Sequence, residues 1–206
     1  MRILVTAGPT REHLDDVRFL SSPSSGRMGF AVATAAARRD HDVALVTGPV
    51  ERDDPTGVAV VRVTSALEML EACRDLWPER DALVMTASVS DWRPAERLAG
   101  KPRRDGDART IALVPNPDIV ADLAAHRRPG QRVVGFALQV DDPLAEAERK
   151  LREKSLDAIV VNTTESFGAP EAGFTLIVPG APPVAWGRLT KDDVAERILD
   201  WLETAP

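Results

Sequence analysis

Short apolar runs alternate along the chain with longer segments in which apolar residues recur every three or four positions. The short runs predict buried strands, and the longer segments predict amphipathic helices. The predicted strands are 2–7, 42–48, 57–63, 81–87, 131–138 and 156–162, and the predicted helices are 26–40, 65–77, 117–127 and 143–155. Strands that alternate with helices favour right-handed crossovers and a parallel sheet. The predicted fold class is therefore α/β, a Rossmann-like, doubly wound and mostly parallel sheet.

The last forty or so residues follow a different pattern. The runs at 174–180 and 182–189 are typical of a β-hairpin, and residues 189–205 predict an amphipathic helix. No repeat or low-complexity linker interrupts the chain. We expect a single domain over residues 1–206, with 165–190 as a hairpin appendage.

Two of the predicted helices have clear N-terminal signals. Ser65 precedes the helix at 65–77 and Glu68 follows three residues later, which is the pattern of a capping box. Asn116 is the expected N-cap of the helix at 117–127, because Pro117 suits its first turn.

Residues 88–116 break the alternation with a polar, charged and proline-marked stretch. Nearly thirty residues with little regular pattern inside a compact domain are usually functional or disordered. Trp92 and a cluster of cations favour a functional role. The sequence leaves open whether residues 88–106 form an ordered wall or a lid, and we expect them to become ordered when nucleotide binds.

Composition and charge narrow the class of protein. Hydrophobic residues make up 44% of the chain and the net charge is −6, which suits a globular protein without a nucleic-acid surface. No apolar run reaches the length of a membrane helix, and the N-terminus shows no signal peptide. Cys73 is the single cysteine, and its helical setting favours a buried structural thiol. We expect a cytoplasmic protein.

Lysine is rare among the cations of this chain. Of 26 cationic residues 22 are arginine, and the lysines are Lys101, Lys150, Lys154 and Lys191. A lysine retained against this background suits a position that needs a compact, mobile ammonium group. Chance is the alternative, because four residues are few.

The loops that follow the parallel strands are expected to converge at one edge of the sheet, where ligands bind in this architecture. The first loop has neither a GxGxxG dinucleotide fingerprint nor a Walker A motif. Gly8, Ser24, Ser25 and Gly26 nevertheless offer backbone N–H groups and hydroxyls to an anion at a helix N-terminus. The alternative is an ordinary serine-rich loop with a capped helix.

Three further side chains are candidates for chemistry. Lys150 and Lys154 are four residues apart and share a helix face, which suits either a polyphosphate or an ordinary solvated surface. Asp91, in a short polar turn, would bind Mg²⁺, a nucleotide hydroxyl or nothing. The histidines have no zinc spacing, and no GxSxG motif is present.

Several segments, taken in order, match one family. They read TAGPTRE, VRFLSSPSSGRMGFAVA, TASVSDWRP, KPRR, NPDIV, VVGFAL and ERKLREKSLDAIVVN. Together they resemble phosphopantothenoylcysteine synthetase, the C-terminal half of the bacterial bifunctional flavoprotein of coenzyme A biosynthesis. The resemblance runs from Met1 to about Trp201.

The resemblance implies a ligase that joins 4′-phosphopantothenate to cysteine. CTP is the favoured nucleotide, with ATP possible, and it would activate the carboxylate as an acyl-nucleotide. Mg²⁺ would accompany the nucleotide phosphates, with no protein ligand identified, and no flavin is expected. The resemblance also implies a homodimer formed through the appendage. A separate flavoprotein decarboxylase would act next, and no nucleic-acid or membrane partner is expected.

The resemblance also implies roles for individual residues. The nucleotide-binding positions are Gly8, Ala87, Asp91, Lys101, Pro117, Asp118, Ile119, Val120, Phe136, Lys150 and Lys154. The phosphate or substrate loop is Ser24, Ser25, Gly26 and Arg27. The candidate catalytic residues are Lys101 and Ser22.

Ser22 departs from the family pattern, which has asparagine at this position. A serine hydroxyl is shorter than the amide and lacks its two-donor end. Two other functions therefore stay open. One is a paralogous acyl-nucleotide ligase with a different acid or amine, and the other is a catalytically silent nucleotide-binding module.

Overall fold

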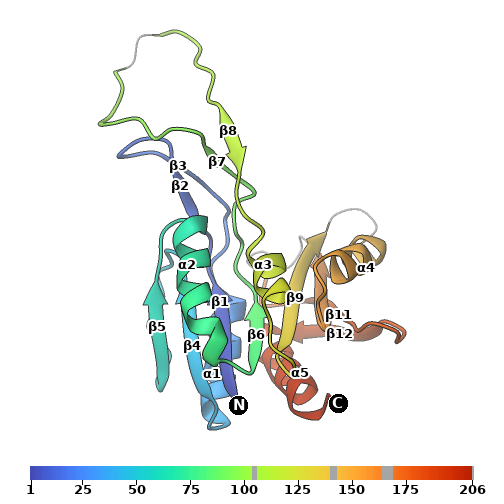
Figure 1. The fold of residues 1–206 in the computed structure, drawn as a ribbon. Coiled ribbons are helices and arrows are strands. Elements are labelled where there is room, and N and C mark those ends of the chain that lie inside the picture. The colour runs from blue at the N-terminus through green and yellow to red at the C-terminus, as the bar shows by residue number, and fades with distance from the viewer. Residues whose placement is uncertain (104–105, 140–142, 164–168, 206) are drawn as a thin grey trace.

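The computed structural model describes residues 1–103, 106–139, 143–163 and 169–205. Its main element is an eight-stranded sheet in the order β12-β11-β10-β9-β6-β1-β4-β5 (Figure 1). The strands are β1 (Arg2–Ala7), β4 (Asp42–Thr47), β5 (Val58–Arg62), β6 (Ala82–Met85), β9 (Arg132–Gln139), β10 (Ala158–Thr163), β11 (Glu171–Ile177) and β12 (Val184–Thr190).

Within this sheet β1, β4, β5, β6, β9 and β10 pair in parallel, and β11 and β12 add antiparallel pairs at one end. Numbered along the chain, the parallel strands lie in the order 3-2-1-4-5-6, which is that of the Rossmann fold. The predicted fold class is confirmed. The direction of winding reverses between β1 and β6, so the ligand crevice is expected at the carboxyl ends of these two strands.

Helices cover both faces of the sheet. On one face α1 (Arg27–Arg38) and α5 (Lys191–Thr204) share a core with the strands. On the other face lie α2 (Ala66–Leu76), α3 (Ile119–Ala125) and α4 (Pro143–Glu153), with the short 3-10 turn η1 (Trp77–Glu79) after α2. Since β1, β4 and β6 are buried on both faces, their residues form continuous apolar runs, as the sequence predicts.

The predicted C-terminal hairpin is present as β11 and β12. It continues the main sheet, because β11 pairs with β10 from Ile159 opposite Ile177 to Asn162 opposite Phe174. The first part of the predicted appendage, residues 165–168, lies outside the described residues. Thr190 caps α5 in a reciprocal capping box with Asp193, which fixes the beginning of that helix.

The two predicted helix caps have different outcomes. Ser65 caps α2 by accepting a hydrogen bond from the backbone N–H of Glu68 at 3.2 Å, as expected. The other half of the predicted capping box differs, because the Glu68 carboxylate accepts from the N–H of Thr64 at 2.7 Å. The predicted cap at Asn116 is wrong, because Asp118 caps α3 by accepting from Ala121 at 3.1 Å. The amide of Asn116 is occupied elsewhere, since it donates to the carbonyl of Ser90 at 2.8 Å.

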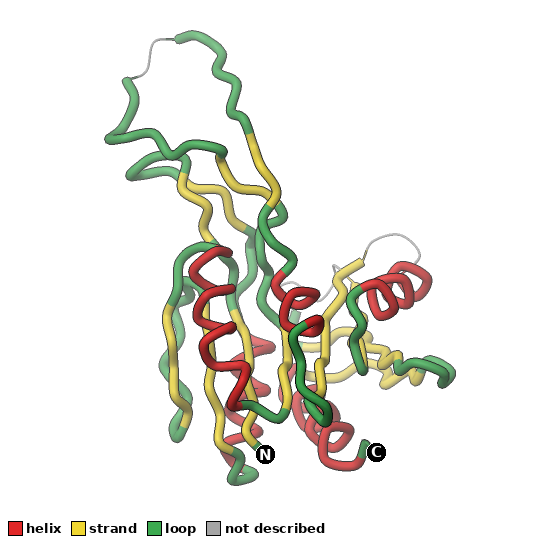
Figure 2. The backbone as a smooth tube through the Cα atoms, viewed as in Figure 1, coloured by secondary structure: helices red, strands yellow, loops and turns green. Residues whose placement is uncertain are grey.

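A long projection rises from the carboxyl edge of the sheet (Figures 1 and 2). It contains two antiparallel ribbons, one of β2 (Arg11–His13) with β3 (Phe19–Ser21) and one of β7 (Trp92–Pro94) with β8 (Leu113–Pro115). We call the described residues 88–103 and 106–116 the arm. Four strands of three residues carry too little periodicity to be predicted from sequence.

The remaining fold-level predictions concern the cysteine and the membrane. Cys73 is fully buried on α2, and burial raises the pKa of its thiol to about 12, so the structural role is confirmed. Within the described part of the chain, no helix combines the length and apolar composition that a membrane crossing needs.

Candidate functional site

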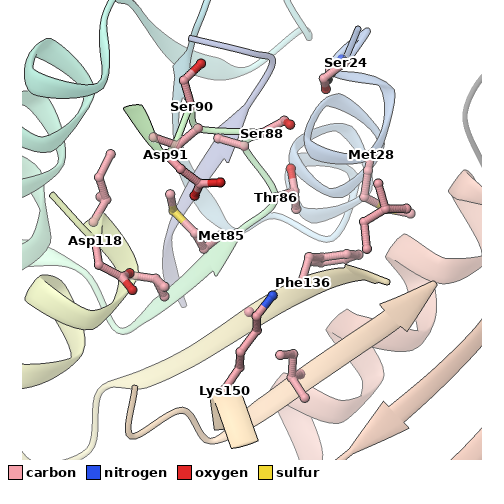
Figure 3. Close-up of a pocket in the computed structure, with 18 of the residues that line it drawn as sticks. Ser24, Met28, Met85, Thr86, Ser88, Ser90, Asp91, Asp118, Phe136 and Lys150 are labelled. Carbon is pink, nitrogen blue, oxygen red and sulfur yellow. Dashed lines mark hydrogen bonds between the residues drawn. The ribbon is translucent and has the colours of Figure 1, made fainter. Parts of the chain in front are cut away.

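A cavity of about 660 Å³ opens at the carboxyl ends of the parallel strands. Its wall includes the loop that precedes α1, the segment that follows β6, the beginning of α3 and one side of α4 (Figure 3). This is the position predicted from the reversal of winding between β1 and β6. The volume lies within the range of small-molecule sites.

The loops after β1 and β6 are tied together beneath this cavity. The backbone N–H of Ser88 donates to the carbonyl of Gly8 at 2.9 Å, and Pro9 forms a bridge with Ser88. Gly8 has φ +74°, and an added Cβ would lie only 3.0 Å from Val50. The turn therefore requires glycine at this position because both the backbone angle and the space exclude a side chain.

The N-terminus of α1 lies in the cavity wall. Its N-cap is Gly26, with φ +71° and no capping side chain, and no acidic residue follows in the first turn. By contrast, serine, aspartate or threonine caps α2, α3 and α5. Together with Ser24, Ser25 and Arg27 in the wall, this arrangement suits an anion.

A close approach between α1 and the sheet fixes where this helix begins. A Cβ on Gly29 would lie 2.5 Å from the Cβ of Ala7 and 2.6 Å from the hydroxyl of Thr86. That hydroxyl also donates to the carbonyl of Thr6 at 2.6 Å. The helix can therefore begin at the edge of β1 and β6 only because residue 29 lacks a side chain.

An ion pair connects α3 and α4 on the other side of the cavity. The ammonium of Lys154 lies 2.9 Å from one carboxylate oxygen of Asp118, and the other oxygen caps α3. Lys150 lies 3.8 Å from Glu146 on its own helix, and Figure 3 shows its ammonium directed into the cavity. Both lysines are about a quarter exposed, so each remains accessible to a ligand.

Asp91 enters the cavity from the arm. Its carbonyl accepts a hydrogen bond from the N–H of Asn116 at 2.8 Å, which joins the beginning of the arm to its end. Figure 3 shows its carboxylate facing the space between α3 and α1. Asp91 is exposed, so its carboxylate is accessible to a bound ligand.

Thirteen of the sixteen predicted site residues line this one cavity. They are Ser24, Ser25, Gly26, Arg27, Ala87, Asp91, Pro117, Asp118, Ile119, Val120, Phe136, Lys150 and Lys154. They come from five segments that lie far apart in the sequence, and the fold brings them together.

The other three predicted residues lie outside the cavity wall. Gly8 lies behind it, where its N–H and Cα are within 3.4 Å of the place that a Cβ on Gly26 would occupy. Ser22 has a buried hydroxyl oxygen without a hydrogen-bond partner among the described residues. Lys101 is exposed on the arm. The roles of Ser22 and Lys101 stay predictions.

Sequence reasoning missed Lys191, which also lines the cavity. It is the first residue of α5, and its ammonium donates to the carbonyl of Ala169 at 3.1 Å. Burial and the nearby charge of Arg27 lower the pKa of Lys191. The rarity of lysine was the available signal, since three of the four lysines lie in this wall.

The described residues contain no cluster of three or more histidine, cysteine, aspartate or glutamate side chains placed to hold a metal ion. Asp91 and Asp118 are the carboxylates in the cavity wall. Carboxylate oxygens are the ligands that hard divalent cations prefer, so these two side chains are the candidate metal ligands of the wall.

Comparison with known proteins supports one family. Residues 1–205 match the family described as DNA/pantothenate metabolism flavoprotein, C-terminal domain. The chain is 45% identical over 170 residues to the Coenzyme A biosynthesis bifunctional protein CoaBC of Vibrio cholerae, covering 81% of this chain and 42% of that protein. It is 42% identical over 169 residues to a cysteine/cysteine sulfinic acid decarboxylase of an unknown prokaryotic organism, covering 82% of this chain and 47% of that protein. The chain thus spans less than half of either relative.

Among solved structures, the C-terminal domain of CoaBC has a TM-score of 0.85 and 36% identity, with 98% of this chain and 93% of that chain covered. The match extends over the sheet, the helices and the loops that build the cavity. The predicted resemblance is confirmed, and this chain belongs to the DNA/pantothenate metabolism flavoprotein C-terminal domain family.

Proposed function

We propose that this domain is a phosphopantothenate–cysteine ligase. The observation that carries the proposal is the convergence of thirteen predicted residues on one cavity, together with their family-specific motifs. The relatives named for coenzyme A biosynthesis support the same activity. The proposal covers the synthetase step alone.

In the first step, a carboxylate oxygen of 4′-phosphopantothenate attacks the α-phosphorus of the nucleotide. The bond between the α-phosphorus and the bridging oxygen breaks, and pyrophosphate leaves. This step needs alignment and charge stabilisation more than covalent help from the protein. Lys150, Lys154 and the N–H groups at the beginning of α1 would supply positive potential to the phosphates.

In the second step, the amine of cysteine attacks the acyl carbon, the nucleoside monophosphate leaves, and the amine nitrogen loses a proton. Ser22 occupies the position where the resemblance implies asparagine. Its hydroxyl is buried, and Ser22 is not among the residues that line the cavity. We expect Ser22→Asn to accelerate amide formation, because the longer amide would reach farther toward the cavity.

We propose CTP as the nucleotide and Mg²⁺ as its counter-ion. The base would lie against the segment from Pro117 to Val120, whose backbone forms the beginning of α3. Asp91 would bind the ribose hydroxyls. In this arrangement Lys154 exchanges its partner Asp118 for phosphate oxygens. When bound, Mg²⁺ would neutralise charge on the triphosphate.

We further propose a cytoplasmic homodimer that works with a flavoprotein decarboxylase. The edge strand β12 would support the predicted contact through the hairpin, since an unpaired strand edge invites pairing with another chain. The arm is a second surface suited to such a contact. Its exposed apolar side chains include Trp92, Leu98 and Leu113.

The test is mass-spectrometric detection of phosphopantothenoylcysteine after incubation with 4′-phosphopantothenate, cysteine and magnesium. CTP and ATP are compared in parallel at equal concentration. We expect product with CTP, formed faster than with ATP, and faster still with the Ser22→Asn variant.

Other outcomes separate the alternatives. Nucleotide consumption with a different acid or amine, but none with phosphopantothenate, would identify a paralogous ligase. Nucleotide binding without consumption of any acid would identify a silent nucleotide-binding module. Faster product formation with ATP would overturn the choice of nucleotide and leave the ligase intact.

A further inference from the structure

The cations of the cavity form two groups from opposite faces of the sheet. Lys150 and Lys154 come from α4, which packs on the face that also carries α2 and α3. Arg27 and Lys191 begin α1 and α5, which pack together on the other face. Helices from both faces of the sheet therefore contribute cations to one cavity. Lys191 is the one cation of these two groups that was not predicted from the sequence.

The second group is placed by the fold and held in position. Thr190 and Asp193 fix the first turn of α5 by their capping box, which places Lys191 at the cavity edge. The carbonyl of Ala169 then accepts a hydrogen bond from its ammonium at 3.1 Å. Lys191 is half-buried, unlike a lysine extended into solvent.

Two positively charged side chains, Arg27 and Lys191, line the cavity from the first turns of α1 and α5. Burial lowers the pKa of the Lys191 ammonium, and repulsion from the charge of Arg27 lowers it further. The uncapped N-terminus of α1 adds the positive end of a helix dipole. A bound anion would relieve this repulsion, and a phosphate group has the charge and the number of acceptor oxygens to do so.

We propose that Lys191, with Arg27, binds a phosphate group of a substrate on the side of the cavity formed by α1 and α5. The proposal rests on the proposed ligase function and adds Lys191 to the residues that bind its substrates. Two substrates of that reaction carry phosphate. The group is either the terminal part of the nucleoside triphosphate or the phosphomonoester of the acid, and the experiment distinguishes them.

The experiment measures dissociation constants by titration calorimetry for Mg-CTP, 4′-phosphopantothenate and unphosphorylated pantothenate. The proteins are the wild type, Lys191→Met, Lys191→Arg and the control Arg197→Met. Arg197 is exposed on the same helix and does not line the cavity, so this control removes one positive charge without touching the site. Circular dichroism checks that each variant is folded.

We expect Lys191→Met to weaken binding of one phosphorylated ligand by about 10- to 100-fold, the range for a lost charge-assisted hydrogen bond. Lys191→Arg should recover much of the loss, and Arg197→Met should bind like the wild type. A loss confined to Mg-CTP assigns the group to the triphosphate. A loss confined to 4′-phosphopantothenate, with pantothenate unaffected, assigns it to the acid.

Equal affinities of Lys191→Met and the wild type for both phosphorylated ligands would overturn the proposal. So would an equal loss in Arg197→Met, because the effect would then come from overall charge. A wild type that binds neither phosphorylated ligand would overturn the ligase function itself. These results are distinguishable, because a failure of the ligase function is seen in the wild type before any variant is compared.

Discussion

The sheet with its cavity and the arm above it are stabilised in different ways. Strands β1, β4 and β6 are buried on both faces, and the cavity wall stands on their carboxyl ends. The arm is held by two short ribbons and a few polar contacts, and it exposes Trp92, Ile111 and Leu113. Close packing fixes the geometry of the cavity, whereas the arm can move at little energetic cost.

Asp16 carries much of the connection between the two ribbons. Its carboxylate accepts from the guanidinium of Arg97 at 2.9 Å and from the N–H of Gly100 at 2.8 Å. The backbone of Leu98 also donates to Leu14 at 2.9 Å. Because Lys101 follows directly, these contacts hold the backbone from which its side chain extends.

The largest effect should come from filling the close approach of α1 to the sheet. Gly29→Val would place its Cβ 2.5 Å from that of Ala7, so the helix must move away from β1. We expect the free energy of unfolding to fall by about 3 kcal/mol, at the upper end of typical overpacking. Urea denaturation measures it. Gly173→Ala is the control because no atom lies within 4 Å of the added Cβ, and an equal loss there would contradict the argument.

A smaller effect is expected within the cavity, at Lys154. Lys154→Ala should weaken binding of Mg-CTP by about 1–3 kcal/mol, because one charge-assisted hydrogen bond is lost. Titration calorimetry measures the affinity. Arg152→Ala on the same helix is the control, since Arg152 is exposed, pairs with Glu148 and does not line the cavity. Unchanged affinity in Lys154→Ala would refute the phosphate contact.

The arm should respond to changes that leave the sheet intact. Trypsin can cut between Arg97 and Leu98, and Asp16→Ala should accelerate this cut several-fold while the free energy of unfolding changes by about 1 kcal/mol or less. Mass spectrometry of the fragments follows the rate. Mg-CTP should slow the same cut in the wild type, as expected if the arm becomes ordered around nucleotide.

Two controls make the arm experiment decisive. Asp54→Ala removes another surface pair, with Arg62, and should leave the cut at Arg97 unchanged. Equal cleavage of the wild type with and without Mg-CTP would contradict ordering of the arm by nucleotide. Equal cleavage of Asp16→Ala and the wild type would show that Asp16 does not hold the arm.

The smallest effect concerns pH and the ribbon of β2 and β3. The guanidinium of Arg18 and the backbone N–H groups of Arg18 and Val17 lower the pKa of Asp15 to about 2. This carboxylate therefore stabilises the fold fully above about pH 4, and the contribution is lost as the pH falls toward about 2. Urea denaturation of Asp15→Asn and the wild type should give stabilities that converge below about pH 4. A difference that is constant or grows on acidification would contradict the assignment.

The difference between the regions also explains what the sequence could predict. The apolar runs of β1, β4 and β6 and the spacing in α1 are strong periodic signals, so the parallel α/β class and the sheet edge that carries the cavity could be predicted from them. The order of the strands was not predicted. The two ribbons of the projection have strands of three residues, and contacts such as those of Asp16 join one ribbon to the other.

Individual site residues divide in the same way. Lys150 and Lys154 were predictable from their spacing on one helix. Lys191 was missed, because the packing of α5 against α1 places it in the same cavity wall as Arg27. Asn116 was predicted to cap α3 because Pro117 follows it. Its side-chain amide instead donates a hydrogen bond to the carbonyl of Ser90, on the other side of the arm. Contacts between residues far apart in the sequence therefore determine both the position of Lys191 and the hydrogen bond of Asn116.

Pyrophosphate release tests the central claim most directly, that the cavity activates an acid with a nucleotide and then transfers it to an amine. The wild type is incubated with Mg-CTP and 4′-phosphopantothenate, with and without cysteine. We predict a single burst of about one equivalent without cysteine, by the two-step mechanism, and continuous release with it. Nucleotide binding without any release that depends on the acid would contradict the account.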